Sequence, residues 1–179
     1  MEIWDLYTKE RVKTDKTMIR GEAHPRGYYR IVVHICIFNS EGKMLIQQRQ
    51  PFKKGWSGFW DLTAGGSAIS GDTSQSAAER ELREELGIDF SFKELCPAIT
   101  VNFQEGFDDI YLLDSDIDLS NLKLQFEEVQ AVKWATAEEI IQMIKDKFFI
   151  PYNEDLIRLL FFLRKHKSLH TECDFTQTK

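Results

Sequence analysis

Residues 66–88 constrain the fold of this chain more than any other stretch. They read Gly-Ser-Ala-Ile-Ser-Gly-Asp-Thr-Ser-Gln-Ser-Ala-Ala-Glu-Arg-Glu-Leu-Arg-Glu-Glu-Leu-Gly-Ile. Gly87 stands where a helix commonly ends in left-handed backbone, and Thr73 or Asp72 can cap the other end. The stretch therefore predicts a helix between two loops, with a glycine pair, Gly65-Gly66, before it.

Three glutamates gather on one side of this predicted helix. At 100° per residue, Glu81, Glu84 and Glu85 fall within an arc of about 100°, directly beside an apolar stripe. Glu81 and Glu85 repel each other at i,i+4, whereas Arg80 can hold Glu84. Mg²⁺ takes carboxylate oxygens as ligands and would relieve the repulsion. A solvated acidic face explains the triplet alone equally well.

The surrounding residues resemble the signature of the Nudix hydrolases, Gly-x5-Glu-x7-Arg-Glu-U-x-Glu-Glu-x-Gly-U, where U is aliphatic. One position departs, because Asp72 stands where the signature has its first glutamate, and its shorter side chain makes a direct metal role doubtful. The other positions match at the family spacing: Gly66, Arg80, Glu81, Leu82, Glu84, Glu85, Gly87 and Ile88.

The resemblance implies an α/β fold, a Nudix-type α/β/α sandwich with a mixed β-sheet. It implies hydrolysis of a nucleoside diphosphate linked to X, or of a related diphosphate, with Mg²⁺ or Mn²⁺. Glu81, Glu84 and Glu85 would hold the metal, and the catalytic group would comprise Arg80, Glu84, Glu85 and Glu128.

Cationic residues follow a predicted hairpin and precede the glycine pair. Arg49 could hold diphosphate oxygens bidentately, and Lys53-Lys54 could add point charges. A solvent-facing basic loop is the alternative, but in Nudix proteins this loop lies near the phosphates. The resemblance therefore assigns substrate binding to Arg49 together with Gly65 and Gly66.

A further carboxylate is needed to take the proton from an attacking water. Nudix enzymes often use a glutamate a few residues before a strand that carries a tryptophan. We expect Glu128 to be this proton acceptor and interpret Glu127 as an ordinary acidic loop residue. The 104–109 segment offers rivals in Glu105 and Asp108.

Aromatic and imidazole groups near these motifs have simpler explanations. Trp60 is expected in the core, whereas the position of Trp56 stays open between core and base stacking. His34 lies in an apolar strand and is expected to be a hydrogen-bonded core histidine. Cys36, in the same strand, is expected to be buried.

The whole chain, 179 residues with a net charge of −6, suits one globular domain and argues against nucleic-acid binding. No membrane span, signal peptide or cysteine pairing motif is apparent, so a reduced, cytoplasmic protein is expected. Its partner would be a small-molecule diphosphate, and the resemblance leaves a homodimer open. The expected division is an N-terminal extension with a small hairpin at 1–28, the Nudix domain at 29–167 and a frayed tail at 168–179.

Apolar periodicity predicts the elements of the domain. One helix should open at a Thr136–Glu139 capping box and run to about 147. Another should run from 153 to about 166, with Leu156, Leu159, Leu160 and Leu163 on its apolar side. Strands are expected at 29–38, 43–48, 59–63 (running into a Gly-Gly loop), 92–103 (interrupted at Pro97), 109–113 and 129–135.

Two other functions compete with hydrolysis. The segments 45–49 and 56–60 also look like isopentenyl diphosphate isomerase, a relative of the same fold. However, Asp61-Leu-Thr-Ala-Gly-Gly66 lacks that enzyme's active-site cysteine and nearby histidine. A non-catalytic nucleotide-binding module would typically have lost carboxylates that this chain retains.

Overall fold

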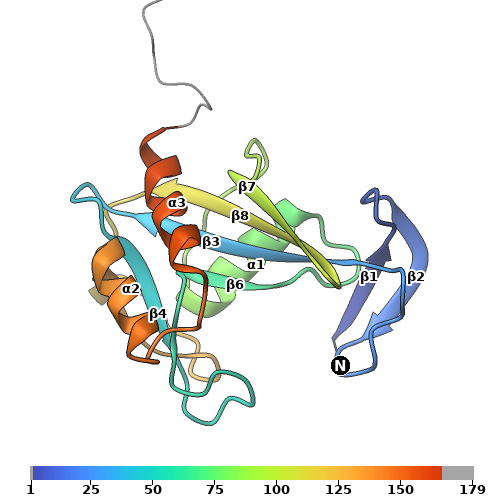
Figure 1. Ribbon diagram of the computed structural model, residues 1–179, viewed down its shortest axis with the longest axis horizontal. Helices are drawn as coiled ribbons and strands as arrows, with labels where there is room; N and C mark the ends of the chain where they lie inside the picture. Colours follow the sequence, from blue (N-terminus) through green and yellow to red (C-terminus); the bar gives the residue numbers. More distant parts are fainter. Residues whose placement is uncertain (1, 167–179) are drawn as a thin grey trace, which may run out of the picture.

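The computed structural model describes residues 2–166, in which β3 to β9 form one mixed sheet and β1 pairs with β2 in a separate hairpin (Figure 1). β3 pairs in parallel with β8 over its whole length and antiparallel with β6 at Val32–Ile35. The elements are β1 Ile3–Tyr7, β2 Lys13–Ile19, β3 Arg30–Phe38, β4 Met44–Arg49, β5 Trp60–Asp61, β6 Ala64–Ser67, α1 Ser74–Leu86, β7 Ile99–Phe103, β8 Gly106–Asp114, η1 Leu119–Asn121, β9 Val129–Ala135, α2 Ala137–Lys145 and α3 Glu154–Lys165.

Helices cover both faces of the sheet, because β3 is apolar on both faces. Val33, Ile35 and Ile37 pack in the same core cluster as α1, whereas Cys36 and Phe38 pack in the cluster that contains residues of α2 and α3. Successive strand side chains point to opposite faces, so the two clusters lie on the two sides of the sheet. The α/β/α sandwich is confirmed, and Figure 1 shows α1 and α3 on opposite sides of β3.

The hairpin β1–β2 packs at one end of the sheet, far from α2 (Figure 1). The fully buried carboxylate of Asp109, on β8, accepts a hydrogen bond from Nη1 of Arg11 at 2.9 Å. Asp5 of β1 accepts from the backbone N–H of Gly71 and the hydroxyl of Ser70, both at 2.8 Å. β1 and β2 pair as a hairpin within the first 28 residues, and these contacts attach it to β8 and to the loop before α1.

Helix boundaries follow the capping residues. Thr73 caps α1, forming a capping box with Ser76, and Gly87 ends the helix in left-handed backbone at φ 69°. Thr136 and Glu139 form the expected capping box of α2. This helix ends at Lys145, two residues before the expected position.

Some predicted elements were wrong. The 92–103 strand is reduced to β7, because Phe92 instead packs against Tyr111 in the core beside α1. The 59–63 strand shrinks to β5, and the expected Gly-Gly loop is part of β6, paired with β3. On α3 the buried residues are Ile157 and Leu160, and Leu156 packs partly buried against the same cluster, whereas Leu159, expected on the apolar side, is exposed.

Further predictions concern the cysteines, membrane spans and the tail. Cys36 is buried and Cys96 is exposed, while Cys173 and the tail at 168–179 lie outside the described residues. Within residues 2–166, no helix is long and apolar enough to cross a membrane.

Candidate active site

A cavity of about 580 Å³ lies between β3, β6, α1 and the loops after β4 and η1. Its wall contains Glu81, Glu84 and Glu85 of α1 and both glycines of β6. Arg49, Arg80 and Glu128, three other residues singled out in the sequence, line the same cavity. The structure therefore brings together all the site residues predicted from the sequence.

The glycines of β6 let the helix carboxylates approach the sheet closely. Gly65 is paired with His34 and Gly66 with Val33 of β3. The N–H of Gly65 donates to Oε2 of Glu85 at 3.2 Å. A Cβ on Gly66 would lie only 2.3 Å from Oε1 of Glu81, so a side chain at this position would collide with the carboxylate.

The three helix carboxylates differ in their surroundings. Glu85 is only 4% exposed and accepts from the Gln47 amide at 3.0 Å. Burial, and secondly the charge of Glu81, raise the pKa of Glu85 to about 8. Burial likewise raises the pKa of Glu81, whereas the side chain of Glu84 is half exposed. Ionisation of Glu85 is therefore costly, and ionisation of Glu81 is costly even beside Arg80.

Arg80 is the cation that contacts this group. Its Nη1 donates to Glu81 at 2.8 Å and to Glu84 at 3.2 Å. Its Nε and Nη2 donate to Asp72 at 3.2 and 3.0 Å, and Nη2 also donates to the carbonyl of Ser67. Burial opposes the charge of Arg80, but Glu81 and Asp72 outweigh it and raise the pKa. Asp72 therefore orients Arg80 and does not line the cavity.

The donor set suits a hard divalent cation. Within residues 2–166, no three Asp, Glu, His or Cys side chains lie close enough together to hold a metal ion as they stand. Nevertheless, Glu81 and Glu84 both contact the guanidinium of Arg80, so the two carboxylates already lie close enough to share one cation. Glu85 adds a third oxygen donor, and the buried Oε1 of neighbouring Gln47 has no hydrogen-bond partner in the described region. Carboxylate and amide oxygens are the ligands that Mg²⁺ prefers.

Charged groups of the loops complete the opposite wall. Lys53 forms an ion pair with Glu128, and Nε of Arg49 donates to the carbonyl of Gly55 at 3.2 Å. Glu127 and Glu105 are exposed and do not line the cavity, which favours Glu128 among the predicted bases.

His34 is hydrogen-bonded, as expected, but it lies at the cavity wall and not in the core. Its ring lines the cavity and is hydrogen-bonded at both nitrogens, to Asp108 at 2.7 Å and to the Tyr152 hydroxyl at 3.2 Å. Burial lowers the pKa of His34, but the carboxylate of Asp108 outweighs it, so the pKa rises to about 8. The apolar neighbours in β3 obscured the fact that alternate residues of the strand face a polar cavity.

The two tryptophans in the loop region are placed differently. Trp60 is partly buried against the core cluster beside α2, as expected. Trp56 lines the cavity with half of its surface exposed. Sequence reasoning also missed Glu2, Arg20, Arg30, Asp61 and Tyr152 in the cavity wall. The hairpin residues among them carry no local signal that would connect them with the acidic helix.

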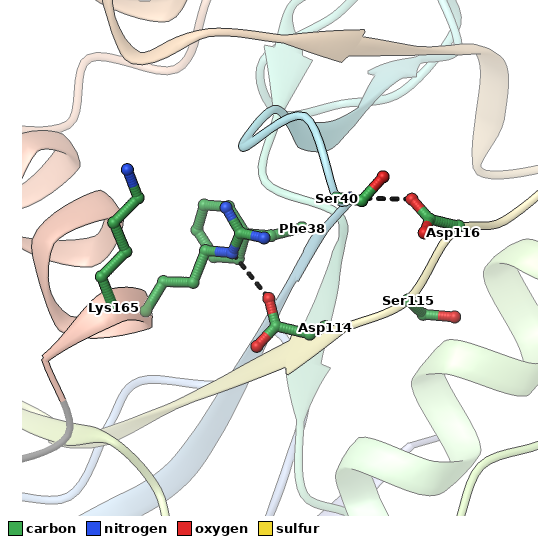
Figure 2. A pocket seen from close by; sticks show the side chains of 7 residues that line it. Phe38, Ser40, Asp114, Ser115, Asp116 and Lys165 are labelled. Atoms are coloured by element: carbon green, nitrogen blue, oxygen red, sulfur yellow. Dashed lines mark hydrogen bonds and ion pairs between the residues drawn. The ribbon is translucent and has the colours of Figure 1, made fainter.

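A second cavity of about 500 Å³ lies at the other end of β3, between the start of the β3–β4 turn and α3 (Figure 2). Asp114 accepts from Nε of Arg164 there, and Asp116 from the backbone N–H of Ser40. Arg164 and Asp114 form an ion pair there, and none of the predicted site residues belongs to this cavity. The cavity beside α1 is therefore the candidate active site.

A mixed sheet between helices, with an acidic loop–helix–loop at its cavity, is a fold found in solved structures. A crystal structure from Deinococcus radiodurans superposes with a TM-score of 0.71 at 24% identity, covering 89% of this chain and 97% of the other. The family model described as NUDIX domain matches residues 28–160. A Nudix hydrolase of Listeria monocytogenes is 45% identical over 170 residues, 95% of this chain and 99% of its own.

The chain therefore belongs to the Nudix family, and it is a hydrolase that acts on pyrophosphate bonds. It is also similar to an isopentenyl-diphosphate Delta-isomerase of Pectobacterium atrosepticum. That similarity is 31% identity over 99 residues, which is 55% of this chain and 54% of the isomerase.

Proposed function

We propose that this protein hydrolyses a phosphoanhydride bond in a nucleoside diphosphate linked to X, or in a related diphosphate, and that it requires Mg²⁺. One observation carries the proposal: partly buried Glu81 and buried Glu85 share a cavity with the cations Arg49 and Lys53. Carboxylates can hold a divalent ion, and the cations can hold phosphate oxygens.

Glu81, Glu84 and Glu85 would hold the ion, which when bound would neutralise charge on the diphosphate oxygens. Arg80 acts as a positioning residue, since it contacts two of these carboxylates and is itself fixed by Asp72. Positioning of the reacting groups and electrostatic stabilisation would supply the rest of the catalysis, as is usual in phosphoryl transfer.

The protein's own groups account for binding and proton transfer in this proposal. Arg49 and Lys53 bind and orient the diphosphate, and Glu128 accepts a proton from the attacking water. The water oxygen forms a bond to phosphorus while the bond to the bridging oxygen breaks and the second phosphate leaves. Glu128 is suited to this role because Lys53 holds its carboxylate at the cavity wall.

Isomerisation is disfavoured by the thiols of the described chain. Cys36 is fully buried in β3, and burial raises the pKa of its thiol. Neither it nor Cys96 lines the cavity. Residues 61–66 contain no thiol that could move an allylic proton. A purely binding role is disfavoured because all three helix carboxylates are present.

The test is a hydrolysis screen over nucleoside diphosphates, triphosphates, nucleotide sugars and dinucleotides, with Mg²⁺ or Mn²⁺ and with excess EDTA. We expect metal-dependent cleavage of at least one class, with isopentenyl diphosphate left unchanged. Wild-type rates in EDTA would rule out the metal requirement. Conversion of isopentenyl diphosphate to its dimethylallyl isomer at enzyme-like rates would favour the isomerase instead.

A further inference from the structure

Arg30 is a cation of the cavity wall that no sequence motif pointed to. It begins β3, and alternation along the strand places Arg30, Val32 and His34 on one side of it, where all three line the cavity. Its Nη1 donates to the hydroxyl of Ser67 at 2.6 Å. Ser67 directly follows the glycine pair, so the guanidinium lies close to the acidic helix.

Two aromatic rings hold the guanidinium in place. The Arg30 Cζ atom lies 4.5 Å from the ring centroid of Trp4, in β1, and 5.5 Å from that of Phe103, at the end of β7. Guanidinium groups are attracted electrostatically to aromatic faces at these distances. The hairpin therefore contributes directly to the orientation of a charged group in the cavity.

Arg30 differs from the other cations of this cavity in having no carboxylate partner. Each of the others forms an ion pair with a carboxylate. The pairs are Arg20–Glu2 at 2.6 Å, Arg80–Glu81 at 2.8 Å, Arg49–Asp61 at 3.9 Å and Lys53–Glu128. In the part of the chain that the structure describes, no carboxylate forms an ion pair with Arg30, and its buried Nε has no hydrogen-bond acceptor. Glu105, Asp108 and Glu2 act on it only at longer range.

This arrangement is unfavourable unless something else supplies the negative charge. Burial lowers the pKa of Arg30, which is the sign of a guanidinium in poorly solvating surroundings. A guanidinium does not lose its proton in proteins, so the charge stays in the cavity. A partly buried charge without a carboxylate partner is costly, and an arriving anion would offset that cost.

We propose that Arg30 binds an anionic group of the substrate, a phosphate or a carboxylate, at the hairpin end of the cavity. This deepens the proposed function and rests on it for the identity of the substrate as a diphosphate. Arg30 lies at the start of β3, whereas Arg49 and Lys53 come from the end of β4 and the loop that follows it. The substrate class that fits is a diphosphate with negative charge at both ends, such as one whose X group carries a phosphate.

The test is calorimetric titration with imidodiphosphate, a diphosphate analogue with a nitrogen bridge, in parallel series with Mg²⁺ and with EDTA. Arg30→Met keeps the length of the side chain and removes its charge. The matched control is Arg158→Met on α3, where the half-exposed arginine pairs only with Glu154 and Asp155 of its own helix in the described region. We expect Arg30→Met to bind at least tenfold more weakly than the control, as is typical of a lost charge-assisted hydrogen bond.

Equal binding by Arg30→Met and the control in both series would overturn the proposal, as would failure of the wild type to bind in either. If Arg30→Met does not fold, Arg30→Lys replaces it. The lysine keeps the charge but cannot present a planar fork of donors, so binding should weaken severalfold, and unchanged binding would count against Arg30. These titrations do not depend on turnover. A protein that binds the probe through Arg30 yet cleaves no substrate would contradict the proposed function alone.

Discussion

Glu81 packs directly over Gly66: a Cβ atom on the glycine would lie 2.3 Å from Oε1 and 2.5 Å from Cδ of the glutamate. The glycine and the glutamate come from separate parts of the Nudix signature, a strand and a helix. Their contact gives a physical reason for the glycine, because only the absence of a side chain leaves room for the carboxylate.

Gly66→Ala should therefore inactivate the enzyme without unfolding it. The three atoms nearest to the added methyl group all belong to the flexible end of the Glu81 side chain, which can move aside more easily than backbone can. The displaced carboxylate would no longer reach its position, and a misplacement of about 1 Å can lower turnover by roughly 100-fold. Steady-state kinetics and thermal unfolding would check this, and a variant with normal turnover would contradict it.

Gly65→Ala provides a contrasting control. Its Cβ would lie 2.8 Å from the backbone carbonyl of Val33 and 2.7 Å from the His34 ring. Backbone cannot move aside as a carboxylate can, so overpacking should lower the free energy of unfolding by about 1–3 kcal/mol. Urea unfolding of both alanine variants would separate the two effects. Equal stability of the two would show that the strand accommodates either methyl group.

The metal-free protein should lose stability as pH rises, in part through Glu85. The pKa of Glu85 is about 8, above its ordinary value of 4.5. The unfolded chain therefore releases this proton first, and stability declines from about pH 4.5 to about pH 8, by roughly a few kcal/mol. Glu85→Gln should remove that part of the slope in urea unfolding with EDTA, while Glu94→Gln, an exposed control, should not. His34 remains in all three proteins, so its own titration largely cancels.

Glu128 and Glu127 are neighbours with different surroundings, which allows a matched test of the proton acceptor. Glu128 lines the cavity and pairs with Lys53, whereas Glu127 is exposed. Glu128→Gln should depress turnover by about 100-fold and flatten the acidic limb of the pH–rate profile. Glu127→Gln should leave both unchanged. If the two variants have the same profile, the base is another group, such as Asp108.

The hairpin should contribute to stability through Arg11. Arg11→Met would leave the fully buried carboxylate of Asp109 without its cation, although Ser74 and Thr100 would still donate hydrogen bonds to it. Loss of one partner of a buried pair typically costs about 3 kcal/mol. Urea unfolding against Arg158→Met would measure this. A loss below about 0.5 kcal/mol would mean that the hairpin is attached mainly by its other contacts.

Local patterns were sufficient to predict helices α1, α2 and α3 and much of the sheet. The caps at Thr73 and Thr136 depend on neighbouring residues, so the start of α2 could be read directly and that of α1 could be narrowed to Thr73 or Asp72. Strand β9 has the predicted bounds. Phe92 was assigned to a strand because of its β propensity. Propensity alone does not reveal that Phe92 packs beside α1.

The site was predictable only where a motif covers it. Helix spacing placed Glu81 and Glu85 on one side of α1, and the Nudix resemblance supplied Arg49 and Glu128. Arg30 depends on contacts with Trp4 and Phe103, which lie 26 and 73 residues away in the sequence. Such long-range placement has no signature in a single sequence.

The central claim is that the carboxylates of α1 bind a divalent ion, and linkage between binding and folding tests it most directly. With free Mg²⁺ at about ten times its dissociation constant, the wild type should gain roughly 1.4 kcal/mol. For a domain of this size the melting temperature should rise by about 3–6 °C. The double variant Glu84→Gln/Glu85→Gln should show no rise, since two of the three carboxylates are lost. If it responds to Mg²⁺ as the wild type does, the ion binds elsewhere and the account is contradicted.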